Sequence, residues 1–215
     1  MVVSLTVGMV ACVSKTTPKL SSIEITPSSP ANIIVGSTLQ LMASGKYPDG
    51  VTMDVTAKVN WESSSTGVII TGTGLVSAME PGIVSVTANL DGITSPAIIL
   101  VVGSVFQGSA TGMWSGQMTI DTKTTLLSGT FSAYIDGNGA IVGTISGTYS
   151  GNMIGKVDLK GNLTGTGNLM VDSTAYVTTW TGSVVASGTS LNIQGTWTGQ
   201  YNGSGTFSGN GTTSN

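Results

Sequence analysis

A five-residue unit of glycine, threonine, an apolar residue, serine or threonine, and glycine recurs in the second half of the chain. The unit and its close variants lie at 112–116, 129–133, 143–147, 147–151, 195–199 and 205–209. Successive side chains of a β-strand point to opposite faces. The unit therefore predicts strands that have glycine and large apolar residues on one face and hydroxyls on the other.

Residues 143–151, GTISGTYSG, show the pattern most clearly. In one continuous strand, Ile145 and Tyr149 would share a face with three glycines, and the threonines and serines would occupy the other face. Glycines between large side chains leave room for an aromatic ring from a neighbouring strand, and they permit the bends of a closed sheet. We therefore expect these strands to form a barrel or a sandwich.

Residues 104–215 are expected to form one Gly-, Thr- and Ser-rich β domain, because they hold 21 of the 31 glycines and no proline. Turn sequences at Asp136–Gly139, Lys160–Asn162 and Tyr201–Ser204 separate the apolar runs. We predict eight to ten antiparallel strands in a meander. A stacked β-solenoid is the alternative, and the irregular spacing of the repeat disfavours it.

Residues 20–102 also alternate as strands do, without the glycine repeat. Ile23 and Ile25 fall on one face of a strand that ends at Pro27, and residues 37–43 and 84–88 alternate in the same way. Trp61 is expected to fill a core. About seven short strands in roughly 80 residues predict an immunoglobulin-like β-sandwich. The whole chain is thus expected to be all-β.

Several motifs of this region occur in a familiar order. They are SIEITP at 22–27, VGSTLQLMA at 35–43, YPDG at 47–50, DVT at 54–56, VNWESS at 59–64, GLV at 74–76, PG at 81–82 and VTA at 86–88. With these motifs, residues 20–102 resemble the bacterial immunoglobulin-like domain, group 2, of intimin- and invasin-like adhesins, surface enzymes and phage virion proteins. The resemblance implies an Ig-like fold and a role as a spacer, sometimes adhesive, without implying a particular activity.

Residues 1–19 are expected to comprise an export signal and a linker. Val2–Val13 is mostly apolar and uncharged, too short for a bilayer span of about 20 residues and typical of a signal peptide. Met9-Val-Ala-Cys12 resembles a bacterial lipoprotein signal, although Met9 replaces the usual leucine and no lysine or arginine precedes the run. Cys12 is therefore the candidate lipidation site. The alternatives are a cleaved secretory signal and an apolar segment with an incidental cysteine.

Charge and composition exclude several functions. Only 8% of the residues are charged, all seven basic residues are lysine, and histidine is absent. A basic surface for nucleic acid or for a membrane is missing, and Ser–His pairs, Cys–His pairs and His–Cys zinc sites are impossible. We therefore expect no enzyme activity, cofactor, metal or nucleic-acid partner. A carboxylate-based glycosidase is a remote alternative that needs two carboxylates in one cleft, drawn from Asp121, Asp136, Asp158 and Asp172.

Aromatic residues of the second domain are the candidate ligand contacts. Most share a face with glycine and are expected to pack in the core. Tyr176 and Trp180 lie in the more irregular stretch 171–181 and are expected to be exposed, while Tyr201 lies in a predicted turn. These three side chains are the candidates for stacking against a ligand such as a sugar ring. Asp136 opens a sequence like the start of a calcium loop, but the later ligands are absent, so a plain turn is expected.

Together these features predict an exported protein of the cell envelope or cell surface, anchored in the membrane by a lipid on Cys12. The Ig-like domain would be a spacer that presents the β domain for adhesion or for binding an extracellular ligand, for which carbohydrate is a candidate. The alternative is a structural subunit of a virion or surface filament, because sheet edges can pair between chains.

Overall fold

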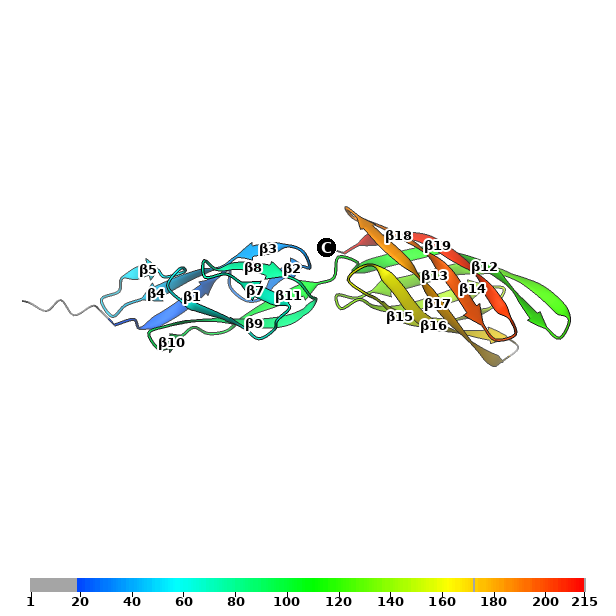
Figure 1. Ribbon diagram of the computed structural model, residues 1–215, viewed down its shortest axis with the longest axis horizontal. Coiled ribbons are helices and arrows are strands. Elements are labelled where there is room, and N and C mark those ends of the chain that lie inside the picture. The colour runs from blue at the N-terminus through cyan, green and yellow to red at the C-terminus, as the bar shows by residue number, and fades with distance from the viewer. Residues whose placement is uncertain (1–18, 172, 215) are drawn as a thin grey trace, which may run out of the picture.

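The computed structural model describes residues 19–171 and 173–214, and the regular elements of these residues are all β-strands. Two β-structures lie end to end along the long axis of the molecule (Figure 1). Strands β1–β11 form the first and β12–β19 the second. The expected all-β fold class is thus confirmed. Residues 19–171 and 173–214 contain no helix that is long and apolar enough to cross a membrane.

The first eleven strands are short and belong to three small sheets. Their bounds are Ser22–Thr26 (β1), Ala31–Ile34 (β2), Thr38–Gln40 (β3), Met42–Lys46 (β4), Thr52–Asp54 (β5), Asn60–Ser63 (β6), Val68–Ile70 (β7), Leu75–Ala78 (β8), Gly82–Leu90 (β9), Ile93–Thr94 (β10) and Ile98–Gly103 (β11). The sheet orders are β1-β4-β5, β3-β8-β7 and β10-β9-β11-β2, and β6 also pairs with β9. Strand β2 runs parallel to β11, and the other pairs are antiparallel.

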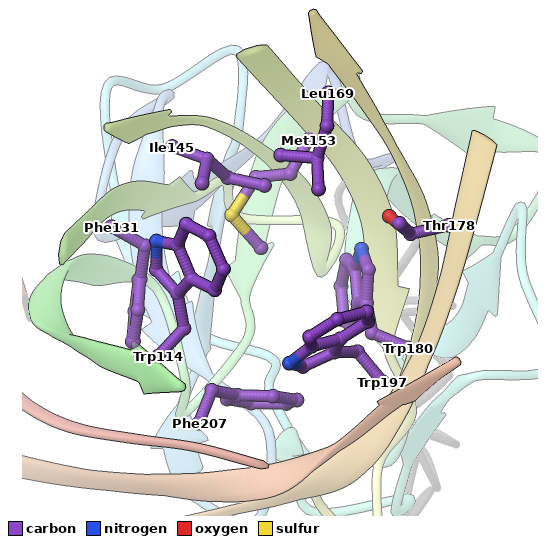
Figure 2. A pocket seen from close by; sticks show the side chains of 9 residues that line it. All are labelled: Trp114, Phe131, Ile145, Met153, Leu169, Thr178, Trp180, Trp197 and Phe207. Atoms are coloured by element: carbon purple, nitrogen blue, oxygen red, sulfur yellow. The ribbon is translucent and has the colours of Figure 1, made fainter. Parts of the chain in front are cut away.

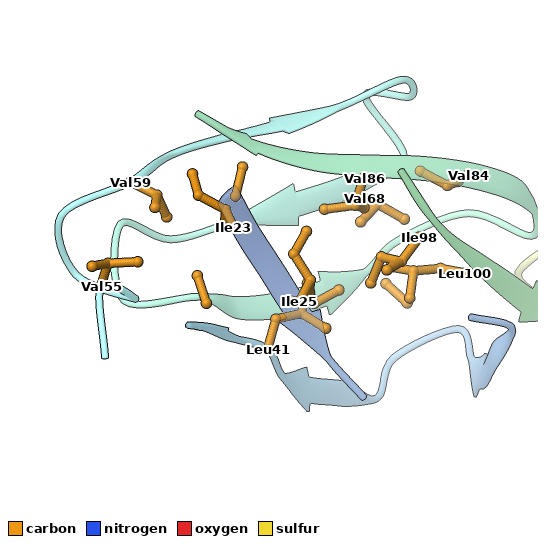
Figure 3. Packing of buried hydrophobic residues seen from close by; sticks show 14 of the residues in the cluster. Ile23, Ile25, Leu41, Val55, Val59, Val68, Val84, Val86, Ile98 and Leu100 are labelled. Atoms are coloured by element: carbon orange, nitrogen blue, oxygen red, sulfur yellow. The ribbon is translucent and has the colours of Figure 1, made fainter. Parts of the chain in front are cut away.

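The core of this Ig-like part consists of the inward side chains of these sheets (Figure 3). Ile23 and Ile25 are both buried on one face of β1, as their alternation predicts. Trp61 packs against the same core, and its indole N–H donates to the Thr56 carbonyl at 3.2 Å. The expected core role of Trp61 is therefore confirmed.

The Ig-like part has more strands than the predicted seven. Segments in which apolar and polar residues alternate without a break are divided into two strands that belong to different sheets. Residues 37–43 alternate as one strand, yet β3 pairs with β8 and β4 pairs with β1. The division lies at Leu41, whose side chain is fully buried and whose backbone N–H donates to the Gly74 carbonyl at 2.8 Å. A single chain segment thus contributes to two layers of the sandwich.

The last eight strands form a closed barrel. Their bounds are Gly108–Ile120 (β12), Lys123–Ile135 (β13), Ala140–Gly147 (β14), Ser150–Val157 (β15), Asn162–Val171 (β16), Thr174–Ser187 (β17), Ser190–Gly199 (β18) and Gly203–Thr213 (β19). Each strand pairs with the next in antiparallel orientation, and β12 pairs with β19 to close the sheet. Of the two predicted possibilities, barrel and sandwich, the structure adopts the barrel.

The glycine repeat is explained by cross-strand packing inside the barrel. Each large ring faces a glycine on the neighbouring strand, in the pairs Trp114–Gly129, Trp180–Gly165, Trp197–Gly205 and Phe207–Gly195. The rings then meet edge to face across the interior, with Trp114 and Trp197 centroids 6.1 Å apart at an angle of 81°. The prediction that the glycines make room for aromatic rings is confirmed.

The segment GTISGTYSG differs from the prediction of one continuous strand. Strand β14 ends at Gly147, whose φ is +135°, and β15 begins at Ser150 after a turn. The backbone N–H of Thr148 donates to the Ser128 carbonyl at 2.9 Å, which holds the turn against β13. Tyr149 still packs against the barrel core, but it does so from the turn. The alternating sequence pattern runs on through a turn of the chain. The positive φ of Gly147 at this turn is a conformation that glycine adopts readily and other residues avoid.

The barrel has two unlike ends. The near end carries the turns at 136–139, 158–161 and 188–189 and adjoins the Ig-like part, where the Ser104 N–H donates to the Gly137 carbonyl at 2.8 Å. The distal end carries the turns that follow β12, β14, β16 and β18. The distal end points away from the Ig-like part (Figure 1). It is therefore the end of the barrel that lies farthest from the Ig-like part.

Candidate ligand-binding surface of the barrel

Two of the three predicted aromatic candidates meet at the distal end. Tyr176 lies at the start of β17 and pairs across the sheet with Leu169 of β16. Tyr201 lies in the turn between β18 and β19, and its ring centroid is 5.3 Å from that of Tyr176 at an angle of 64°. Tyr176 is half-buried, and Tyr201 is 51% exposed. The structure thus brings together two rings that are 25 positions apart in the chain.

Tyr201 occupies a backbone conformation that a tyrosine adopts at a cost. Its φ is +57° and that of Asn202 is +50°, and the Gly203 N–H donates to the Gln200 carbonyl at 3.1 Å, which defines a tight hairpin turn. Glycine and asparagine are the usual residues at such positions. The Tyr201 carbonyl accepts a bond from Thr119 N–H at 3.0 Å, so the turn is also tied to β12. Strained residues of this kind concentrate at functional sites.

The outer wall beside this pair carries ordered rows of hydroxyl and amide side chains, which we call the hydroxyl face. Its first row runs across four strands as Thr179, Thr198, Ser204 and Gln117. Its second row runs across five strands as Thr164, Thr181, Thr196, Thr206 and Ser115. All nine are exposed, and none is charged. Neighbouring positions are about 4.8 Å apart across strands and about 6.7 Å apart along them.

The third predicted aromatic candidate is buried, so the expectation that Trp180 is exposed is wrong. Trp180 is 5% exposed and projects into the barrel, where its ring lies over Gly165 and Gly155. Its ring meets that of Phe207 edge to face, with centroids 6.2 Å apart. Residues 174–181 of the stretch that contains Trp180 belong to the regular strand β17, in which Thr179 and Thr181 point outward. Trp180 is an even number of positions from Thr178 and Val184, so all three lie on the same, buried side of β17. This alternation is the sequence feature that indicates its burial.

The predicted carboxylate sites separate into turns. Asp136 Oδ1 accepts the backbone N–H groups of Asn138 and Ala140 at 2.9 and 2.8 Å, so the predicted hairpin turn is present here. Asp158 makes an equivalent turn at the same near end, whereas Asp121 lies in the distal turn after β12. Among residues 19–171 and 173–214, no three His, Cys, Asp or Glu side chains converge as a metal site. Asp172 and the candidate lipidation site Cys12 lie outside the described residues.

The turn at Asp158 holds its carboxylate in two hydrogen bonds from Asn162. The Asn162 side-chain amide donates to Asp158 Oδ2 at 2.7 Å, and the Asn162 backbone N–H donates to Oδ1 at 2.8 Å. These bonds favour the charged form and lower the pKa of the Asp158 carboxyl below its ordinary value. This carboxylate therefore stabilises a turn at the near end, away from the tyrosine pair.

Comparison with known proteins identifies the first domain. Residues 19–102 match the family model of the bacterial Ig-like domain (group 2), which confirms the resemblance found in residues 20–102. Domains of this family are typically modules of extracellular surface proteins.

One curated relative is also similar. Ice-binding protein 1 of Shewanella frigidimarina (strain NCIMB 400) is 28% identical over 149 residues, which cover 59% of this chain and 17% of that protein. Because 59% is more of the chain than residues 1–102 comprise, the similarity includes part of residues 103–215. The chain spans less than a fifth of the length of that relative.

Proposed function

We propose that this is an exported cell-surface protein whose Ig-like domain is a spacer and whose barrel binds neutral carbohydrate at its distal end. The observation that carries this proposal is the Tyr176–Tyr201 pair, held at the distal end by a turn that is unfavourable for tyrosine. The end-to-end arrangement of the two domains suits such presentation (Figure 1).

The tyrosine pair offers the apolar part of the proposed contact. Tyrosine rings combine a flat apolar surface with a hydroxyl, and they are rigid enough to bind with little loss of side-chain entropy. The axial C–H groups of a sugar ring form a complementary apolar face. Tyr201 is exposed and therefore accessible to such a partner.

The hydroxyl face offers the polar part. Its side chains are donors and acceptors of the kind that match sugar hydroxyls, and the Thr179 and Thr198 hydroxyls already lie 3.0 Å apart in one row. The absence of charge in both rows favours a neutral ligand over an acidic one. A row that crosses four or five strands suits a polymer better than a single sugar.

Replacing Tyr201 with asparagine is expected to weaken binding to a neutral polysaccharide at least about tenfold, because a central tyrosine contact is typically worth that much. Asparagine suits the positive φ of this turn, so the variant is expected to fold. Affinity electrophoresis against a panel of neutral polysaccharides measures the effect. Tyr134→Asn, which removes an exposed tyrosine from the outer side of β13, is the control. Equal binding by wild type and Tyr201→Asn would contradict the proposal.

Binding to ice is a second candidate, favoured by the similarity to a relative named as an ice-binding protein and by the regular spacing of the hydroxyl face. The same variants separate the two ligands. Inhibition of ice recrystallisation that survives Tyr201→Asn but is lost in Thr196→Lys would support ice, since Thr196 is central to the second row.

Anchoring through Cys12 completes the proposal and rests on the lipoprotein-like sequence around it. The chain, expressed with its natural upstream sequence, is expected to carry a diacylglycerol mass on Cys12 and to fractionate with membranes. Both properties are expected to disappear in Cys12→Ala, as measured by mass spectrometry and fractionation. Unmodified Cys12 in assembled material would instead support the subunit of a virion or filament.

A further inference from the structure

The interior of the barrel contains a cavity that the packed rings leave unfilled (Figure 2). Its volume is about 40 Å³, roughly three times the space that one water molecule needs. Nine side chains from β12–β19 line it, and none of them is ionisable. Eight are apolar or aromatic, and the ninth is Thr178. A charged occupant would therefore be unpaired, so the cavity suits a neutral molecule.

One polar group at this cavity lacks a partner. The indole Nε1 of Trp180 is buried and makes no hydrogen bond within the described structure. The other barrel tryptophans are satisfied, because Trp114 Nε1 donates to the Ser146 carbonyl at 3.1 Å and Trp197 Nε1 donates to the Ser115 carbonyl at 3.2 Å. Figure 2 shows the Trp180 nitrogen on the edge of the ring that is turned toward Thr178. A buried unpaired N–H favours an occupant that can accept its hydrogen bond.

The surroundings also indicate what covers the cavity and how its volume can change. Tyr176 is the next residue toward the distal end on the inner side of β17 after Thr178, so the tyrosine pair lies over the cavity. Met153 also lines the cavity, from β15 (Figure 2), and its flexible thioether can change rotamer to enlarge the space.

We infer that the barrel interior is a binding site for a compact, largely apolar, neutral molecule of about four heavy atoms that carries one hydrogen-bond acceptor, such as a carbonyl oxygen. The Trp180 N–H donates to that oxygen, and the surrounding rings contact the apolar part. None of the residues that line this site belongs to the outer hydroxyl face. A failure to bind carbohydrate would therefore not count against this inference.

Acetone and isobutene are suitable probes because they share one shape and differ in the acceptor. In a titration of the full chain followed by ¹H–¹⁵N spectra, acetone is expected to shift the Trp180 indole resonance downfield and saturably. In Trp180→Phe, the affinity for acetone relative to isobutene is expected to fall about 3- to 10-fold, the worth of one hydrogen bond. Trp61→Phe removes an indole from the Ig-like core and should retain the wild-type ratio.

Two outcomes would overturn the inference. One is a relative affinity for acetone that is the same in Trp180→Phe and wild type. The other is a wild-type Trp180 resonance that neither probe shifts in a saturable manner. The titration of the wild-type Trp180 resonance needs no variant. It therefore tests the inference even if Trp180→Phe fails to fold.

Discussion

Replacing Trp114 with alanine is expected to lower the free energy of unfolding of the barrel by about 3–5 kcal/mol, the usual cost of deleting a buried tryptophan side chain. Trp114 is buried against Trp197, and its N–H bond to the Ser146 carbonyl links β12 to β14. The substitution therefore removes packing and leaves a carbonyl without its donor. Urea unfolding, followed by the fluorescence of the remaining tryptophans, measures the loss.

Met113 provides the matched control for Trp114. It is the preceding residue of β12, points outward and is 70% exposed, so Met113→Ala is expected to change stability by less than about 0.5 kcal/mol. Resonances of the Ig-like core should report the wild-type unfolding transition in both variants, because that domain has a separate core. Equal losses in Met113→Ala and Trp114→Ala would contradict the assignment of inner and outer faces.

Replacing Gly165 with alanine is expected to destabilise the barrel by about 3 kcal/mol, near the upper end of the range for overpacking a core. An added Cβ would lie 2.0 Å from Trp180 Cζ2 and 2.3 Å from the Ile154 carbonyl oxygen. The ring is confined by Phe207 and the carbonyl belongs to the sheet, so neither can move aside cheaply. Thermal and urea unfolding measure the effect.

Gly137 is the control for this substitution. A Cβ at Gly137 would meet Gln107 Oε1 at 3.4 Å, an ordinary contact with a flexible side chain. Gly137→Ala is therefore expected to be nearly neutral. If Gly165→Ala and Gly137→Ala lost similar stability, the glycines of the repeat would be needed for their backbone conformation. Space for the aromatic rings would then not be the reason for them.

The pairing of large rings with glycines on neighbouring strands explains how the repeat favours a barrel. Trp180 opposes Gly165 and Trp197 opposes Gly205, so each ring occupies the space that its neighbour leaves empty. The parity of rings and glycines was readable from residues alone, because side-chain direction in a strand depends only on position along it. The buried face and the hydroxyl face could be predicted for this reason, whereas the Asp136 turn could be predicted from its Asp-Gly-Asn-Gly sequence.

The candidate site was only partly predictable. Tyr176 and Tyr201 were identified as candidates, but their contact depends on the pairing of β17 with β18 and on the turn that follows β18. The irregular composition of residues 171–181 obscures the alternation that places Trp180 on the inner side of β17 with Thr178 and Val184. The strained φ of Tyr201 could not be read from the sequence, since tyrosine is unusual at such a position.

What the sequence determined by itself was local: strand faces, several turns, the near-absence of charge and the family motifs of the first domain. What only the tertiary structure decided was non-local: the pairing of β12 with β19 that closes the barrel, the reversal at Gly147, the alignment of hydroxyl rows and the cavity beneath the tyrosines. The physical reason is that alternation is set by each strand's own backbone. Register and closure instead depend on the sum of weak contacts between segments that are far apart in the chain.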